Sequence, residues 1–373
     1  MVQQACIDHT KEAILALMSV PGIGPVTIDR LVGYFGGAEQ VLSASRDAFL
    51  HLPWLKGPQK QALLRGVDPG RVELAKDKLQ KMGAWVIHKE EACYPHLLKA
   101  VYPLPVLLFG LGDAAVLNLP CVAIVGSRRP TSYGTKVAFE IARDLAGQGV
   151  CIVSGMAMGI DASAHRGALD AGGKTIAVLG CGIDRVYPAR NNRLKYEIAK
   201  NGAVITEFFP GTAPEPGNFP QRNRIVSGLC LGVVVVEAGF RSGSLITASL
   251  ALEQGREVMA VPGSVRSFLS KGTHWLLKQG AVLVEDAQDV MNQLGLDTSM
   301  KGHEPEGTIV VDEPKKQRIL ESLGPYPVHI DEIAQTTGID AGEVAAVLVE
   351  LELEGLVEAL PGKFFQTALE IER

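Results

Sequence analysis

Short, continuous runs of apolar residues recur along the middle of the chain and predict buried β-strands. Between residues 84 and 286 these runs read AWVIHKE, VLLFGLG, CVAIVGS, GVCIVSG, KTIAVLG, GAVITEF, LGVVVVEAG, REVMAVPG and AVLVED, with helix-like stretches between them. A run that is apolar on both faces is typical of a strand covered by helices on both sides, with a right-handed crossover at each step. We therefore predict an α/β domain over residues 83–294, an extended Rossmann-like fold with a doubly wound, mainly parallel sheet.

Helical patterns flank this core on both sides. Residues 1–82 contain short helices broken by PGIGP at 21–25 and LPWLKGP at 52–58, which predicts an N-terminal helical domain of the SAM or helix-hairpin-helix type. Such turns can bring backbone N–H groups close to a phosphate. Lys and Arg are sparse around both turns, however, which favours a bundle that packs on its neighbour.

The end of the chain predicts a linker and a third domain. Residues 295–313 are rich in Gly, Asp, Glu and Pro and show no period, as in a linker. Residues 314–373 contain three helical patterns and then GLVEALPGKFFQ, a two-stranded wing with PGK at its turn, so we predict a winged-helix domain. Its third helix carries Glu343, Glu350, Glu352 and Glu354 without Lys or Arg. These charges would repel phosphates, which favours a protein partner for this module.

Charge is unevenly distributed along the chain. The formal net charge is −5, but residues 312–373 contain 13 Asp and Glu against 5 Lys and Arg. Residues 121–294 contain 18 Lys and Arg against 14 Asp and Glu, so the predicted core is mildly basic and can attract a polyanion.

Cysteine usage and the apolar runs indicate a cytoplasmic protein. The six cysteines are scattered without a CxxC pair, which favours a reducing compartment. Asp8, Lys11 and Glu12 interrupt the segment where a signal peptide would be apolar, and no run approaches eighteen apolar residues. We expect neither secretion nor a membrane span.

The loops that follow the predicted strands carry the candidate chemistry. In open α/β sheets, ligands collect at the carboxyl ends of the strands, where helix N-termini favour anions. The first loop of the repeating core, GSRRPTSYG, lacks the glycine pair of a dinucleotide site and has Arg128 and Arg129 instead. The loops SGMAMGIDASAHRG, GCGIDRVYPARNNRL, FPQRNRIVSG and EAGFRSGSLITA add glycines, hydroxyls, rings and further arginines at the same predicted edge.

The agreement among these loops predicts one anion-binding site. Arginine forks suit phosphates, Phe219 or Tyr187 can stack on a base, and glycine and serine allow close backbone approach. Arg128, Arg222 and Arg224 are the expected principal anchors. The candidate residues of this anion-binding site are Gly126, Ser127, Arg128, Arg129, Ser154, Gly155, Gly159, Arg190, Asn191, Phe219, Arg222, Asn223, Arg224, Ser242, Gly243, Ser244 and Thr247.

A catalytic interpretation has less support. Asp161 and His165 are four residues apart and could form an acid/base or metal pair, but an Asp at a helix start complements the dipole and no third ligand is in view. Glu237 is the best single catalytic candidate, and one carboxylate beside arginines more often orients them. We expect no metal, no cofactor and no enzymatic activity.

Taken in order, the loops resemble the DNA-processing protein A family, DprA/Smf, of bacterial natural transformation. The resemblance rests on GSRRPTSYG, SGMAMGIDASAHRGAL, GGKTIAVLGCGIDRVYPARN, TEFFPGTAPEPGNFPQRNRIVSGL, EAGFRSGSLITASLALEQGREVMAVPG and KGTHWLLKQGA, over about residues 100 to 290. It implies a non-enzymatic homodimer that binds single-stranded DNA and loads RecA onto strands coated by single-strand binding protein, a further expected partner. Asn191 matches the YPxxN element, although Ala189 stands where relatives can carry a basic residue.

Two other functions remain open from the sequence. Related Rossmann-like families bind or hydrolyse small nucleotides at the same strand ends, but they resemble PGGxGT where this chain has RSGSLIT. A winged-helix transcription regulator would bind duplex through residues 314–366. The chain lacks a basic helix that could fill a groove of duplex DNA, which favours single strands.

Overall fold

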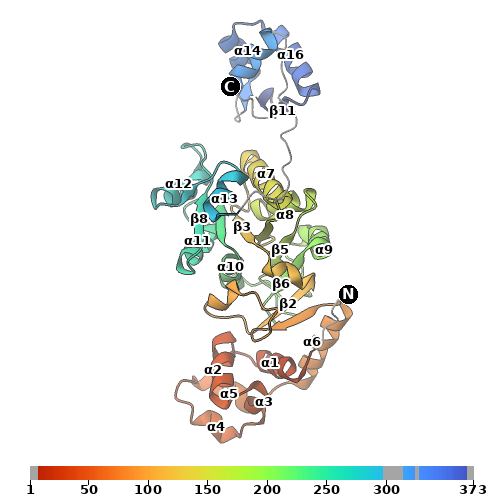
Figure 1. Ribbon diagram of the computed structural model, residues 1–373, viewed down its shortest axis with the longest axis vertical. Helices are drawn as coiled ribbons and strands as arrows, with labels where there is room; N and C mark the ends of the chain where they lie inside the picture. The colour runs from red at the N-terminus through yellow and green to blue at the C-terminus, as the bar shows by residue number, and fades with distance from the viewer. Residues whose placement is uncertain (1–6, 297–313, 324–326, 368–373) are drawn as a thin grey trace. The chain divides into compact units, whose positions relative to one another are not determined.

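The structure, a computed structural model, describes residues 7–296, 314–323 and 327–367 (Figure 1). The chain divides into two compact units, with the boundary between residues 301 and 302. The predicted linker lies outside the described residues from position 297 onward. Within the described ranges, no helix has both the length and the apolar character needed to span a bilayer.

A nine-stranded sheet forms the centre of the first unit, in the order β1-β2-β6-β5-β4-β3-β7-β8-β9. All pairs from β6 to β9 are parallel, whereas β1 with β2 and β2 with β6 are antiparallel. The prediction of a mainly parallel sheet is confirmed, and each predicted run contains one strand. The strands are β1 (Trp85–His88), β2 (Leu107–Gly112), β3 (Cys121–Val125), β4 (Cys151–Ser154), β5 (Thr175–Val178), β6 (Ala203–Thr206), β7 (Gly232–Val235), β8 (Glu257–Ala260) and β9 (Val282–Leu283).

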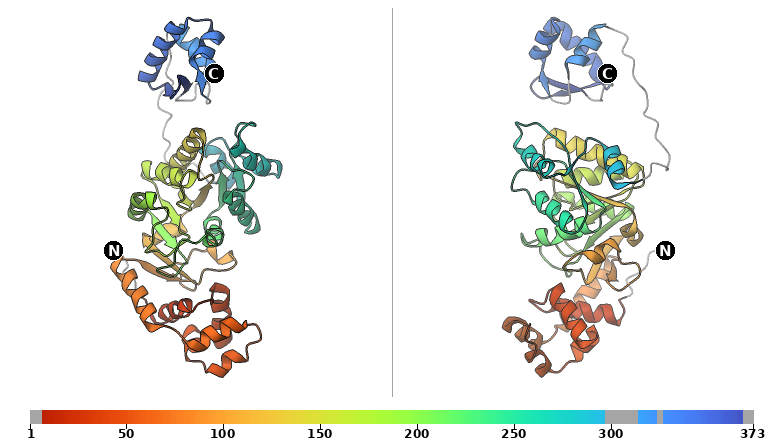
Figure 2. Two further views of the ribbon diagram at one scale, coloured as in Figure 1. Left: turned by 180° about the vertical axis from the view of Figure 1, so that it is seen from behind. Right: turned by 60° about the vertical axis from the view of Figure 1, so that its left-hand side comes forward.

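Helices cover both faces of this sheet, as the continuous apolar runs require (Figure 2). In β3, Val122 and Ile124 pack with α7, α8 and α13, whereas Ala123 and Val125 pack with α10, α11 and α12. The helices after β3 are α7 (Ser132–Gly147), α8 (Ile160–Asp170), α9 (Asn192–Asn201), α10 (Asn218–Gly228), α11 (Gly243–Glu253), α12 (Lys271–Lys278) and α13 (Ala287–Leu294). Short 3-10 helices are η1 (Leu97–Ala100), η2 (Ala114–Asn118), η3 (Ala189–Asn191) and η4 (Phe268–Ser270).

The strand order reverses at β3. The chain moves from β3 through β4 and β5 to β6 on one side, then returns to β7 on the other side of β3. Residues 122–125 of β3 lie opposite residues 232–235 of β7. A crevice opens where loops leave in opposite directions, so the carboxyl ends of β3 and β7 are the expected ligand site.

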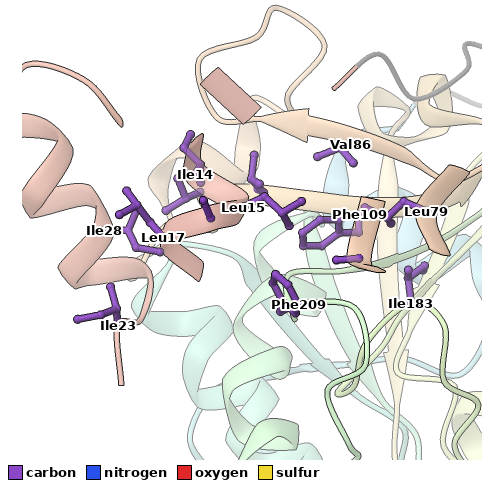
Figure 3. Packing of buried hydrophobic residues seen from close by; sticks show 14 of the residues in the cluster. Ile14, Leu15, Leu17, Ile23, Ile28, Leu79, Val86, Phe109, Ile183 and Phe209 are labelled. Atoms are coloured by element: carbon purple, nitrogen blue, oxygen red, sulfur yellow. The ribbon is translucent and has the colours of Figure 1, made fainter. Parts of the chain in front are cut away.

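The N-terminal helices pack directly on one edge of the sheet. Ile14, Leu15 and Leu79 share a buried cluster with Phe109 and Phe209 of the α/β domain (Figure 3). The bundle therefore packs on its neighbour, as its sparse basic residues indicated. Its helices are α1 (His9–Ser19), α2 (Pro25–Phe35), α3 (Ala38–Ser43), α4 (Arg46–Leu50), α5 (Gly57–Arg65) and α6 (Pro69–Lys81).

The second unit is a winged helix with its own core. Ile319, Ile333, Val344, Leu348 and Leu351 are buried together, one stripe from each helix. Its three-stranded sheet has the order β10-β12-β11. The elements are α14 (Pro314–Ser322), β10 (Val328–His329), α15 (Ile330–Thr337), α16 (Ala341–Leu353), β11 (Val357–Leu360) and β12 (Phe364–Thr367), which confirms the predicted three helices and wing.

Candidate nucleic-acid interface

A groove of about 640 Å³ lies at the switch point, among the loops that follow β3, β4, β5, β6, β7 and β8. Loops far apart in the sequence meet there, as the sequence predicted. The predicted residues that line the groove are Gly126, Ser127, Arg128, Gly155, Phe219, Arg222, Asn223, Ser242, Gly243, Ser244 and Thr247.

The loop after β3 presents one exposed arginine to the groove. A Cβ at Gly126 would lie 2.7 Å from Ile160 Cγ1, so only glycine fits between the loop and α8. Arg128 is exposed, and its guanidinium carbon lies 5.3 Å from the centre of the Phe219 ring. Arg129 is also exposed but does not line the groove; its backbone N–H donates to Ser127 Oγ at 3.1 Å. Arg128 is therefore the cation of this loop that can meet a ligand.

Glu237, two residues after the end of β7, fixes the same loop through hydrogen bonds. Its Oε2 accepts from the Thr131 N–H at 2.9 Å, and its Oε1 accepts from Thr131 Oγ1 at 2.6 Å. Thr131 Oγ1 in turn caps α7 by accepting from the Gly134 N–H at 3.1 Å. Glu237 therefore orients Thr131 and not an arginine, because both of its carboxylate oxygens accept from Thr131. The buried carboxylate fixes the path of the Arg128 loop instead.

Two predicted residues, one at the end of β4 and one in the loop after it, shape the fold and do not line the groove. Ser154 is fully buried and donates to the Ile124 carbonyl at 2.7 Å, joining β4 to β3. Gly159 has φ of 79°, and a Cβ there would lie 2.4 Å from the Ser127 carbonyl oxygen. Their assignment as DNA contacts is therefore corrected. The Ser154 hydroxyl donates its hydrogen bond inside the sheet. Gly159 allows the loops after β3 and β4 to contact each other.

Two aromatic rings form one wall of the groove. The centres of Tyr187 and Phe219 are 5.4 Å apart, with 41° between the ring planes. Tyr187, which the sequence suggested as a stacking ring, also lines the groove and is 41% exposed. An exposed ring beside a cation is the chemistry of base stacking next to a phosphate.

The YPxxN element contributes less than predicted. Arg190 is exposed but does not line the groove. Asn191 is buried, and its Nδ2 donates to the carbonyls of Met156 at 2.9 Å and Ala157 at 3.3 Å. Asn191 thus fixes the turn after β4, where Met156 adopts φ of 56°. Its assignment as a DNA contact is corrected, because the side chain is buried and its amide nitrogen donates to the carbonyls of this turn.

Arg222 contributes to the lining of the groove although its side chain is buried. Its side chain is buried, and Nη1 donates to the Val178 carbonyl. Gly155 leaves room for it, since a Cβ there would lie 2.2 Å from Nη1. Burial lowers the pKa of Arg222, while the charge of the buried Asp161 opposes this shift. Guanidinium remains charged at neutral pH, so Arg222 adds positive potential at the base of the groove.

Arg224 was predicted as a principal anchor, and this is wrong. Arg224 is 6% exposed, and its guanidinium pairs with the equally buried Glu207. It does not line the groove. Burial raises the pKa of Glu207, and Arg224 opposes that shift. Arg224 therefore neutralises an internal carboxylate instead of meeting a ligand.

The N-terminus of α11 also borders the groove. Ser242 caps the helix by accepting from the Ser244 N–H, and its hydroxyl lies 2.7 Å from Ser244 Oγ. Asn223 Nδ2 donates to the Gly243 carbonyl at 3.3 Å, which links α10 to this turn. Arg241 is exposed and lines the groove. A helix N-terminus with a cation beside it favours an anionic ligand.

Several lining residues were missed from the sequence. Phe268, which is 65% exposed, follows the predicted strand REVMAVPG at the same edge, so a search of every strand end would have found it. Ile246, Pro214 and Pro216 also line the groove. Their apolar side chains give no chemical signal in the sequence.

His165 lies in the interior, whereas Asp161 is buried at the lining of the groove. Asp161 Oδ2 accepts from the Ala157 N–H at 3.2 Å, and His165 is fully buried with Nδ1 2.7 Å from Thr175 Oγ1. The Thr175 hydroxyl donates to the Ile152 carbonyl, so it accepts from His165 Nδ1–H. Burial lowers the pKa of His165 to about 3. Among the residues that the structure describes, no group of three or more His, Cys, Asp and Glu is arranged to hold a metal ion.

Comparison with known proteins identifies the family of the chain. The family model DNA recombination-mediator protein A matches residues 85–295, and the DprA winged helix domain matches residues 303–363. Protein Smf of Escherichia coli K12 is 39% identical over 294 residues, which cover 77% of this chain and 78% of that protein.

Two solved structures are similar to this chain. The X-ray structure of DNA processing protein A from Streptococcus pneumoniae has a TM-score of 0.67 and 37% identity, covering 76% of this chain and 97% of that one. DNA processing protein A from Helicobacter pylori, in a study of its single-stranded DNA binding mode, has a TM-score of 0.51 and 34% identity, covering 56% and 95%. The chain therefore belongs to the DNA recombination-mediator protein A family, DprA/Smf.

Proposed function

We propose that this chain binds single-stranded DNA in the groove at the switch point and acts as a mediator of recombination. In natural transformation it would protect the incoming strand and load RecA onto it. The proposal is supported by the H. pylori relative, whose structure concerns single-stranded DNA binding.

The observation that carries the proposal is an exposed cation beside two aromatic rings that contact each other. Arg128 lies over Phe219, which contacts Tyr187, and all three line one groove. A single strand can place a phosphate at the guanidinium and turn a base onto a ring. A duplex keeps its bases paired and stacked, so it could use only the cations. We therefore expect weak sequence preference and a preference for single strands.

The proposal includes a homodimer. Phe240, Ile246, Phe268 and Trp275 are each more than 40% exposed, and they lie on or beside α11, η4 and α12. A gathering of exposed apolar side chains on a water-soluble fold is typical of a protein contact. Ile246 and Phe268 also line the groove, so a second copy there would border the DNA. RecA and single-strand binding protein are the further proposed partners.

DNA binding is tested by titrating the protein into labelled oligonucleotides. The parent should bind an unstructured single strand more tightly than a duplex of equal length. Arg128→Ala should weaken single-strand binding about tenfold, because a charge-assisted phosphate contact is lost. Arg129→Ala is the matched control from the same loop and should change little. Equal binding of both DNA forms by the parent would refute the proposal.

RecA loading is tested separately. RecA assembly on single strands coated with single-strand binding protein should begin sooner with the parent, as seen in a shorter lag of DNA-dependent ATP hydrolysis. Arg128→Ala should leave the lag unshortened at concentrations where it does not bind. If the parent binds DNA without shortening the lag, the mediator role is wrong while the DNA site stands.

A further inference from the structure

Asp184 connects the N-terminal helical domain to two loops of the groove. It belongs to the loop after β5, residues 179–191. Its Oδ2 lies 2.8 Å from Lys78 Nζ on α6, and its Oδ1 accepts from the Gly211 N–H at 2.6 Å. Gly211 belongs to the loop after β6, residues 207–217. One carboxylate thus joins three segments that are separate in the sequence.

The two loops are also tied directly to each other. The Gly182 N–H donates to the Thr212 carbonyl at 3.0 Å, and Arg185 Nη2 donates to the Gly211 carbonyl at 3.4 Å. A Cβ at Gly182 would lie 2.7 Å from Asp184 Oδ1 and 2.8 Å from the Gly211 nitrogen. Only glycine lets the loops approach this closely, so their relative position is tightly specified.

Apolar contacts reinforce the connection to α6. Leu79, the residue after Lys78, shares a buried cluster with Ile183 of the first loop and Phe209 of the second (Figure 3). The guanidinium carbon of Arg71, also on α6, lies 5.0 Å from the centre of the Phe209 ring. Helix α6 therefore contacts both loops through polar and apolar side chains.

The aromatic pair of the groove lies in and directly after these loops. Tyr187 lies three residues after Asp184, and Phe219 follows the second loop in the first turn of α10. The rings meet at 5.4 Å and 41°, and a shift of one loop relative to the other would change this arrangement. Partial burial opposes ionisation of Asp184, but the bonds from Lys78 and the Gly211 N–H outweigh it and lower its pKa. The carboxylate is thus ionised at neutral pH.

We propose that Asp184 is a positioning residue, through which α6 of the helical domain sets the arrangement of Tyr187 and Phe219 for stacking on a DNA base. The inference rests on the proposed function of the groove. It gives the N-terminal domain a role in DNA binding without a DNA contact of its own. The exposed ion pair of Lys81 and Asp77, at 3.8 Å, by contrast lies entirely within α6.

Three variants separate the two bonds of Asp184. Asp184→Ala removes both, Lys78→Met removes only the ion pair, and Lys81→Met is the control on the same helix. Asp184→Ala should weaken binding of an unstructured oligonucleotide about tenfold, as expected for one stacked base. Lys78→Met should weaken it less, and Lys81→Met not at all. Lys78 is partly exposed, so its variant decides the matter if Asp184→Ala does not fold.

Two further readouts separate positioning from general stability. The slope of log affinity against log salt should stay at the parent value in Asp184→Ala and Lys78→Met, because the phosphate contacts remain. In a Phe219→Ala background, Lys78→Met should cost nothing more, because the ring through which it acts is gone.

The proposal is overturned if both folded variants bind as tightly as the parent, if the salt slope falls, or if the Lys78 and Phe219 effects add. Failure of the proposed function would look different: the parent itself would then show no preference for single strands, and Arg128→Ala would bind like the parent.

Discussion

The groove of the α/β domain and helix α16 of the winged helix are the two places where their folds ordinarily meet nucleic acids. In the groove, the exposed cations Arg128 and Arg241 stand beside helix N-termini. Helix α16 carries no Lys or Arg. The winged-helix fold often binds DNA through this helix, but the acidic side chains of α16 suit a basic surface instead. The fold determines where a ligand could lie, and the side chains decide which ligand it is.

The cations nearest to α16 strengthen this contrast. Lys315 of α14 pairs with Glu343, and Lys316 lies 3.1 Å from Glu350 and 2.9 Å from Glu354. These lysines neutralise the carboxylates of their own module. Arg224 does the same inside the α/β domain, where it pairs with Glu207, whereas Arg128 has a ring as its neighbour. A basic residue therefore indicates a phosphate site only where it does not already pair with a carboxylate of its own domain.

The largest effect is expected from breaking the internal pair. Arg224→Met should lower the free energy of unfolding by about 3–5 kcal/mol, because it leaves the Glu207 charge buried and unpaired. Adding Glu207→Leu should recover most of that loss. Urea unfolding followed by tryptophan fluorescence measures it, since all three tryptophans, Trp54, Trp85 and Trp275, lie in the first unit. A stable Arg224→Met variant with weak DNA binding would instead place Arg224 in the groove.

Acidification should destabilise the first unit through His165. Its folded pKa of about 3 lies below the ordinary 6.5, so the unfolded state binds a proton between these values and the folded state does not. The stability that this difference in His165 pKa contributes is fully present above pH 6.5 and is lost progressively as the pH falls toward 3. Between pH 6.5 and 5 the loss is about 2 kcal/mol.

The control for this pH effect is His165→Phe, which loses the bond to Thr175 but also the proton linkage. Its free energy of unfolding should depend less on pH than that of the parent over the same range. Parallel curves for parent and variant would show that His165 does not titrate as its burial requires.

The next largest effect, on DNA binding, is expected from the aromatic rings that line the groove. Phe219→Ala should weaken single-strand binding by about 1–3 kcal/mol, because it removes a stacking surface. Tyr196→Ala is the matched control, since Tyr196 is 72% exposed and does not line the groove. Fluorescence anisotropy measures both. Equal losses for the two variants would mean that no base stacks on Phe219.

The smallest effect is expected from α16. Replacing Glu350 and Glu354 with Gln should change the affinity for single-stranded DNA by less than about twofold in physiological salt, because exposed charges outside the site are screened. The same titration measures this. A gain of tenfold or more would show that the acidic helix opposes DNA binding and would remove the contrast between the two regions.

The sequence predicted the strands and the ligand edge because both follow from local patterns. Continuous apolar runs identify buried parallel strands, and the chain direction places their carboxyl ends together. The orientation of individual side chains is not local. FPQRNRIVSG was interpreted as a loop, but it lies within α10, where Arg222 and Arg224 are two residues apart and point in different directions. Only the packing decides that Arg222 lines the groove and Arg224 meets Glu207.

Long-range contacts were equally invisible in the sequence. Ser154 and Asn191 carry polar groups suited to a ligand, yet their partners are backbone carbonyls on neighbouring strands and turns. Lys78 and Asp184 are 106 residues apart, and nothing near either position indicates the other. Such pairs follow from how the domains pack, which the periodicity of the chain does not encode.

The salt dependence of single-strand binding by the parent and Arg128→Ala tests the central claim most directly. If Arg128 holds a phosphate of a flexible strand, the slope of log affinity against log salt should be smaller in the variant by about 0.7. Arg129→Ala should keep the parent slope. An unchanged slope for Arg128→Ala, with the fold intact, would contradict the claim that this groove holds the DNA backbone.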